Sequence, residues 1–167
     1  MTEYISKGMR LYYKGFVTKL EKREVFVFGS NLSGYHGKGS AGYATCYDTK
    51  GLPDYYSKPF GWKGKWNIKG IGEGYQEGTE GASYALPTVK SLQPRQSQSL
   101  EEITDSIKTL YKLAHEYPEW NFLIGYTNTN NLLCGYSMDQ LMECFLKIYP
   151  PPNIIFSETL SSYFEKE

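Results

Sequence analysis

The feature that most constrains this chain is a short apolar run that ends directly at a glycine-rich loop. Residues 24–28 read EVFVF, a pattern typical of a buried β-strand, and Gly29 follows. The next residues, GSNLSGYHGKGSAG, lead into small residues that predict a helix from about Ser40 to Tyr47. A strand, a glycine-rich loop and a helix in this order place free backbone N–H groups where a phosphate can bind. The alternative is that the glycines serve turns alone, since the loop matches neither GxxxxGK[ST] nor GxGxxG.

Further strands are predicted on both sides of this segment. The segment RLYYKGFVTKL (residues 10–20) predicts one or two strands at an edge of a sheet. A second glycine-rich segment, GIGEGYQEGTEG, precedes a strand at Ala82–Leu86 that Pro87 should close. Residues 121–127 and the run NIIFS (153–157) predict two more strands.

Two capping boxes predict the beginnings of two helices. Ser99 with Glu102, and Ser137 with Gln140, have the spacing in which each side chain bonds the other residue's backbone. The first helix should end near residue 117. The second should end at prolines 150–152, with one face formed by Leu141, Met142, Phe145 and Ile148.

This alternation predicts one α/β domain over residues 1–167, with a three-layer α/β/α arrangement around a mostly parallel or mixed sheet. Residues 48–70 carry lysines among aromatic residues without a clean period, which indicates an insert or a hairpin. Ligands of such sheets bind where parallel strands end. The loops after the strands that end near Phe28, Leu86 and Thr127 should therefore share one crevice.

Composition narrows the setting of the protein. A chain of 167 residues fits one domain, and no apolar run approaches the roughly 20 residues that span a bilayer. The three cysteines stand at unrelated spacings, which favours reduced thiols and a cytoplasmic location, and no Cys/His cluster indicates a metal or cofactor. Residues 1–70 hold 12 Lys and Arg against 5 Asp and Glu, so the first part of the chain can attract an anionic ligand.

Several segments together resemble a family of small phage and bacterial proteins that are similar to divergent macrodomains. The segments are FVFGSNLSGYHGKGSAGYA, GIGEGYQEGTEGASYALPT, LEEI, HEYP and NIIF, in this order, between about Glu24 and Phe156. Macrodomains bind ADP-ribose, and some remove it from proteins or nucleic acids. The resemblance therefore implies a nucleotide ligand of the ADP-ribose type and, if the chain is phage-encoded, a location in the host cytoplasm.

The resemblance also implies two ligand-binding loops. In the first, Asn31 takes the place of the asparagine that holds the ribose, and the phosphate-contacting part begins near Gly37. In the second, only the end, Cys-Gly-Tyr, follows the related G-C-G pattern well. The implied ligand-binding residues are Gly29, Ser30, Asn31, Gly37, Lys38, Gly39, Ser40, Thr127, Asn128, Cys134, Gly135 and Tyr136.

Hydrolysis needs a group that activates water near the ribose. Lys38 and Ser40 stand where some active macrodomains place an acid, so Glu73 is the alternative base. We predict catalytic roles for Asn31, His36 and Glu73. The competing interpretations are a turn residue for Asn31, an exposed loop histidine for His36 and a solvated carboxylate for Glu73.

Three functions follow from these features. The first is a macrodomain-like binder of ADP-ribose or a related nucleotide, with ADP-ribosyl hydrolysis as its catalytic version. The second is a non-catalytic phage protein that sequesters a nucleotide immune signal of the cyclic ADP-ribose type. The third is a single-stranded nucleic acid binder built on the aromatic insert, which the neutral net charge disfavours.

Overall fold

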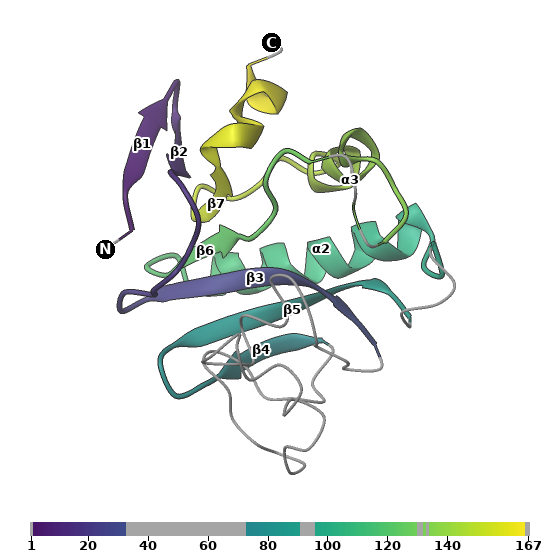
Figure 1. The fold of residues 1–167 in the computed structure, drawn as a ribbon, viewed down its shortest axis with the longest axis horizontal. Helices are drawn as coiled ribbons and strands as arrows, with labels where there is room; N and C mark the ends of the chain where they lie inside the picture. Colours follow the sequence, from purple (N-terminus) through teal and green to yellow (C-terminus); the bar gives the residue numbers. More distant parts are fainter. Residues whose placement is uncertain (1, 33–72, 91–95, 130–131, 133, 166–167) are drawn as a thin grey trace.

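The protein folds around a mixed seven-stranded sheet with the order β1-β2-β7-β6-β3-β5-β4 (Figure 1). The computed structural model describes residues 2–32, 73–90, 96–129, 132 and 134–165. The strands are β1 (Tyr4–Lys7), β2 (Arg10–Tyr13), β3 (Glu24–Asn31), β4 (Gly74–Glu77), β5 (Ala82–Val89), β6 (Asn121–Ile124) and β7 (Ile154–Ser157). Neighbouring strands from β2 to β5 are parallel, while β1 and β4 run antiparallel at the two edges. The predicted α/β class with a mixed sheet is confirmed.

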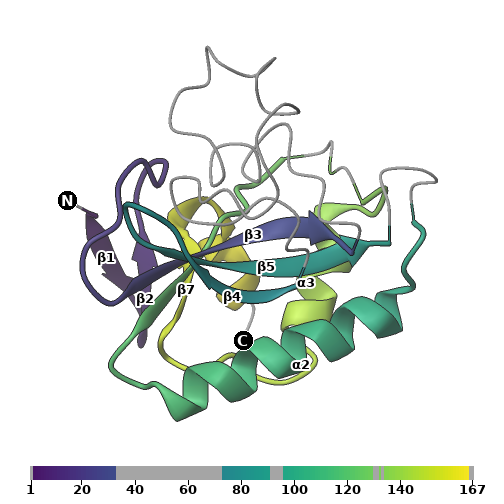
Figure 2. The same ribbon diagram turned by 90° about the horizontal axis from the view of Figure 1, so that it is seen from below.

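Two α-helices cover one face of this sheet, α2 (Leu100–Glu116) and α3 (Met138–Phe145) (Figure 2). Both begin at the predicted capping boxes, and their apolar faces share one core cluster with residues such as Val25 and Val27 of β3. The short 3-10 helix η2 (Glu158–Phe164) follows β7 and joins the same core through Leu160. In the described part of the chain, none of these helices is long and apolar enough to cross a membrane.

The opposite face of the sheet carries a second apolar cluster, which includes Phe26, Phe28, Leu123 and Ile155. Alternation along β3 explains this division, because successive side chains of a strand point to opposite faces. The helix predicted at 40–47 and the insert at 48–70 lie outside the described residues. The three-layer arrangement therefore stays an expectation.

Several strand boundaries differ from the predicted ones. The predicted end of the first strand at Gly29 is wrong, because β3 continues to Asn31, and β5 passes through Pro87 to Val89. Pro87 is tolerated because it lies beyond the last residue pair with β4 and beside a register shift between β3 and β5. The glycine-rich segment before β5 contains β4, which the sequence reading missed.

The second helix also ends earlier than predicted. It stops at Phe145, before the three prolines, and Ile148 is 50% exposed instead of joining the buried face. The predicted strand at 121–127 pairs as a strand only to Ile124. The residues after Ile124 are therefore free to leave the sheet and form a loop at its carboxyl end.

Buried polar side chains close the amino ends of the parallel strands. The Glu24 carboxylate accepts hydrogen bonds from the Thr2 hydroxyl at 2.9 Å, from the Tyr4 hydroxyl and from the Glu21 backbone N–H at 2.7 Å. Asn153 donates from Nδ2 to the backbone oxygens of Ala114 in α2 and of Tyr117 and Trp120 in the turn before β6, at 3.0, 3.1 and 2.9 Å. This end of the sheet is thus held by polar residues whose bonding capacity is used within the protein.

Candidate functional site at the carboxyl end of the sheet

The end of β3 brings two predicted ligand residues to the carboxyl end of the sheet. Ser30 and Asn31 are only 3% and 4% exposed, and they pair with Pro87 and Val89 of β5. The backbone N–H of Leu32 then donates to the Val89 carbonyl at 3.1 Å. Asn31 therefore lies at the end of a central strand, in a more buried and better fixed position than a residue of an exposed loop.

Tyr126, a residue of the second loop, explains why position 29 is a glycine. A Cβ atom on Gly29 would lie 2.2 Å from Oη of Tyr126, which is shorter than any tolerable contact. The Tyr126 ring packs edge-on against Phe145, with 6.5 Å between ring centroids. Burial raises the pKa of Tyr126, and a hydrogen bond with the Thr88 side chain acts against this increase. Tyr126 thus fills the space over Gly29 and joins the ends of β3, β5 and β6.

The second loop leaves β6 over the ends of β3 and β7. The Gly125 N–H donates to the Val27 carbonyl at 2.7 Å, and a Cβ atom there would lie 2.7 Å from the Phe26 ring. Three residues later, the Asn128 backbone N–H donates to the Thr159 hydroxyl at 3.0 Å. Thr127 is half-buried and Asn128 is exposed, so this part of the loop is open to a ligand.

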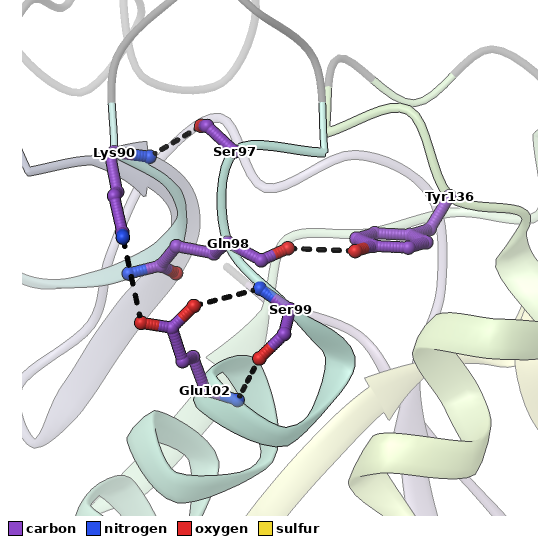
Figure 3. A network of polar contacts seen from close by, with 6 residues as sticks. All are labelled: Lys90, Ser97, Gln98, Ser99, Glu102 and Tyr136. Atoms are coloured by element: carbon purple, nitrogen blue, oxygen red, sulfur yellow. Dashed lines mark hydrogen bonds and ion pairs between the residues drawn. The ribbon is translucent and has the colours of Figure 1, made fainter.

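The last part of the second loop is tied to the segment before α2. Gly135 has a φ of 86°, which favours glycine, and its carbonyl accepts from Nε2 of Gln96 at 2.8 Å. The Gln96 backbone N–H donates to the Cys134 carbonyl at 2.8 Å, and Cys134 is buried and forms no disulfide. The Tyr136 hydroxyl donates to the Gln98 carbonyl at 2.7 Å (Figure 3). These contacts give Cys134, Gly135 and Tyr136 a structural role, whatever a ligand adds.

The same network reaches the end of β5 (Figure 3). The Lys90 N–H donates to the Ser97 hydroxyl at 2.8 Å, and Lys90 Nζ lies 3.9 Å from a carboxylate oxygen of Glu102. The capping hydrogen bond from the Ser99 backbone N–H holds the pKa of Glu102 below its ordinary value, and the Lys90 charge adds to this. The segments after β5 and before α3 are therefore fixed to the first turn of α2.

Glu73 lies at this end of the sheet but is separated from the end of β3. It precedes Gly74, which pairs with Ala85 of β5, and Ala85 pairs with Phe28 of β3. Two strand spacings place the Glu73 backbone about 10 Å from β3. The side chain of Glu73 is exposed, and its charge adds to burial in raising the pKa of Tyr84 to about 12.

The structure thus brings together part of the predicted site. Gly29, Ser30 and Asn31 lie at the end of β3, and Thr127 and Asn128 follow β6, the strand beside it. The predicted residues His36, Gly37, Lys38, Gly39 and Ser40 lie outside the described part of the chain.

The sequence reading missed four residues that shape this end of the sheet, which are Thr88, Tyr126, Ser157 and Thr159. The dipeptide Gly125-Tyr126 directly after an apolar run was a usable signal, because it repeats the strand-then-glycine pattern of β3. No comparable signal marked Ser157, the last residue of β7, or Thr159 after it.

Two grooves lie on other parts of the described surface. A groove of about 580 Å³ runs between α2 and α3, and another of about 450 Å³ is lined by α3 residues and Tyr163. Within residues 2–32, 73–90, 96–129, 132 and 134–165, no group of three or more His, Cys, Asp or Glu residues is placed to hold a metal ion. In comparisons with known proteins, the chain matches no family model and no curated protein.

Proposed function

We propose that this protein binds a nucleotide of the ADP-ribose type at the carboxyl ends of β3 and β6. The observation that carries the proposal is the convergence of two distant segments, Gly29–Asn31 and Thr127–Asn128, at the ends of adjacent parallel strands. Parallel sheets bind ligands at this position, because the loops after neighbouring strands open there. The macrodomain resemblance assigns Asn31 to the ribose and places Thr127 and Asn128 at the start of the second phosphate loop, whose Cys-Gly-Tyr end follows the family pattern best.

The chemistry of the two segments suits such a ligand. Asn31 supplies an amide that can both donate to and accept from ribose hydroxyls. Asn128 and Thr127 add an exposed amide and a half-buried hydroxyl on the other side of the Gly29–Tyr126 contact. Polar groups of this kind fix the orientation of a bound ligand without requiring a metal ion.

A second candidate is capture of the nucleotide without turnover, and the position of Glu73 favours it. Its backbone lies two strand spacings from β3, or about 10 Å, with β5 between them. A general base must come within hydrogen-bond reach of the attacking water, directly or through one further water. Binding therefore has more support than hydrolysis, and the hydrolase version depends on Glu73 reaching across β5.

Calorimetric titration with ADP-ribose tests the proposal. We expect saturable binding by the native chain and a loss of about tenfold or more in affinity for Asn31→Ala, which corresponds to roughly 1.4 kcal/mol. Asn121→Ala is the matched control, because Asn121 begins β6 at the opposite end of the sheet. Asn31→Asp, nearly identical in shape, replaces Asn31→Ala if thermal unfolding shows that the alanine variant is unstable.

A second experiment with the same protein distinguishes hydrolysis from capture. After incubation with an ADP-ribosylated peptide, chromatography that shows released ADP-ribose, and less of it with Glu73→Gln, supports a hydrolase. A peptide recovered unchanged by a protein that binds ADP-ribose supports capture. The absence of both heat and a thermal shift on adding ADP-ribose would overturn the proposal.

A further inference from the structure

The second loop is attached to the segment that follows β7. The Asn128 backbone N–H donates to Oγ1 of Thr159 at 3.0 Å, and Oγ1 of Thr159 lies 2.8 Å from Oγ of Ser157. The Thr159 N–H also donates to the Ser157 hydroxyl at 3.2 Å. A hydroxyl carries one proton and two lone pairs, so Thr159 can accept from Asn128 and bond to Ser157 at once.

This attachment comes where the sheet no longer holds the loop. The last strand residue of β6 is Ile124, and the Gly125 N–H makes one further backbone bond to Val27 of β3. Figure 1 shows the chain after β6 passing beside η2. The bond from Asn128 to Thr159 therefore fixes the loop three residues beyond its backbone hydrogen bond to β3 and two residues beyond Tyr126, which lies over Gly29.

Residues near Thr159 in the sequence are fixed by the core. The neighbouring Leu160 is fully buried in the core, and Ser157 is only 1% exposed. Lys7 of β1 lies 3.5 Å from the Glu158 carboxylate and donates to the Ser161 hydroxyl at 3.3 Å, so it contacts η2 before and after Thr159 in the sequence. The hairpin of β1 and β2, which lies outside the macrodomain-like part of the sequence, thus supports the residue that holds the loop.

We propose that Thr159 is a positioning residue of the nucleotide site. Its hydroxyl holds the Asn128 backbone, and with it Thr127, at a fixed place beyond the end of β6, in the geometry that the ligand needs. The inference rests on the proposed function, because it gives the loop a ligand to contact. Because the Asn128 backbone N–H donates to Thr159, Asn128 would contact a ligand through its side chain.

The test compares Thr159→Val, which removes the hydroxyl and keeps the shape, with Thr159→Ser, which keeps the hydroxyl. We expect Thr159→Val to lower the affinity for ADP-ribose about fivefold, the effect of one net hydrogen bond, and Thr159→Ser to restore most of it. Thr104→Val is the matched control, because the Thr104 hydroxyl bonds the Leu100 carbonyl within α2, at 2.8 Å. Thermal unfolding of all three variants shows whether the affinity follows general stability.

A second measurement does not need a ligand. Amide hydrogen exchange of Asn128, followed by NMR, should become at least about threefold faster in Thr159→Val and stay near the native rate in Thr159→Ser. An unchanged rate in Thr159→Val would overturn the inference, and so would equal ADP-ribose affinities of the native and valine proteins. If the native protein binds no ADP-ribose, the proposed function is wrong, and the exchange rate alone still decides whether Thr159 holds the loop.

Discussion

The two ends of the parallel strands are built in opposite ways. At the amino end, buried polar side chains bridge separate segments. Asn153 joins the start of β7 to α2 and the turn after it, and Glu24 joins β3 to the N-terminal residues. At the carboxyl end, Gly29 and Gly125 allow close packing, and the polar residue Asn128 remains exposed. The amino end uses buried carboxylate and amide groups within the protein, while the carboxyl end also carries the exposed side chain of Asn128.

This difference predicts which substitutions should lower the free energy of unfolding and which should lower ligand affinity. A buried donor that loses its partners costs more free energy than an exposed one, because water replaces the missing bond only at the surface. Substitutions at the amino end should therefore act on folding, and those of exposed polar residues at the carboxyl end should act on binding. Gly29 lies at the carboxyl end but is needed for packing, so its substitution should affect both stability and binding.

The largest expected effect comes from Asn153→Ala. This change leaves three backbone oxygens without the Asn153 amide, and Asn153 is only 7% exposed, so we expect the free energy of unfolding to fall by about 3 kcal/mol. Asn128→Ala is the matched change at the other end, and it should stay within about 0.5 kcal/mol of the native protein. Urea unfolding measures both. An equal loss of stability in the two variants would remove the contrast between the ends.

The next effect concerns Gly29, where packing and the proposed site overlap. In Gly29→Ala, the new methyl group would lie 2.2 Å from Oη and 3.0 Å from Cζ of Tyr126, so we expect a loss of about 2 kcal/mol in the free energy of unfolding. Tyr126→Phe removes the nearer atom. The double variant should therefore lose less stability than the sum of the two single variants, in a double-mutant cycle measured by urea unfolding.

The control for this cycle is Gly125→Ala. Its methyl group would lie 2.8 Å from the Val27 carbonyl, a backbone atom of β3 that cannot turn away as a side chain can. Tyr126→Phe should not relieve that variant. If the losses at Gly29 and Tyr126 simply add, then Tyr126 does not occupy the space above Gly29, and that space is available to a ligand.

The sequence predicted the elements that depend on neighbouring residues. Both capping boxes, at Ser99 and Ser137, form as expected, because a cap and its partner lie three residues apart. The apolar run at 24–28 and the NIIF run also form strands, since burial on both faces selects apolar residues at every position. Local signals therefore specified most of the central sheet and its two described helices.

Features that depend on distant partners were not predictable in this way. The strand β4 consists of GYQE, a poor strand by composition, and it forms because β5 lies beside it. Pro87 predicted a strand end but lies within β5, since the pairing with β4 stops at Ala85 and the register with β3 shifts beside Pro87. In the candidate site, the hydrogen bond from Asn128 to Thr159 joins residues 31 positions apart, and no local sequence pattern predicts such a pairing.

The smallest expected effect tests whether the Glu73 charge raises the pKa of Tyr84. Burial and the charge of Glu73 raise the pKa of Tyr84 to about 12, so the neutral phenol favours the folded state. The associated stability is complete below the ordinary pKa of 10.0 and is lost as the pH rises toward about 12. Glu73→Gln removes one of the two causes, so the Tyr84 titration, followed by NMR of ¹³C-labelled tyrosine, should move slightly to lower pH.

Tyr75 is the control within the same spectrum. Its pKa is raised to about 12 by burial and by Glu77, and Glu73 is not among its causes, so Glu73→Gln should leave its titration unchanged. A shift of Tyr84 alone would place the Glu73 charge close to β5, on the path that a hydrolase needs. If Tyr84 does not move, the Glu73 carboxylate lies in solvent, and the carboxyl end of the sheet loses its candidate base while its proposed binding residues stay in place.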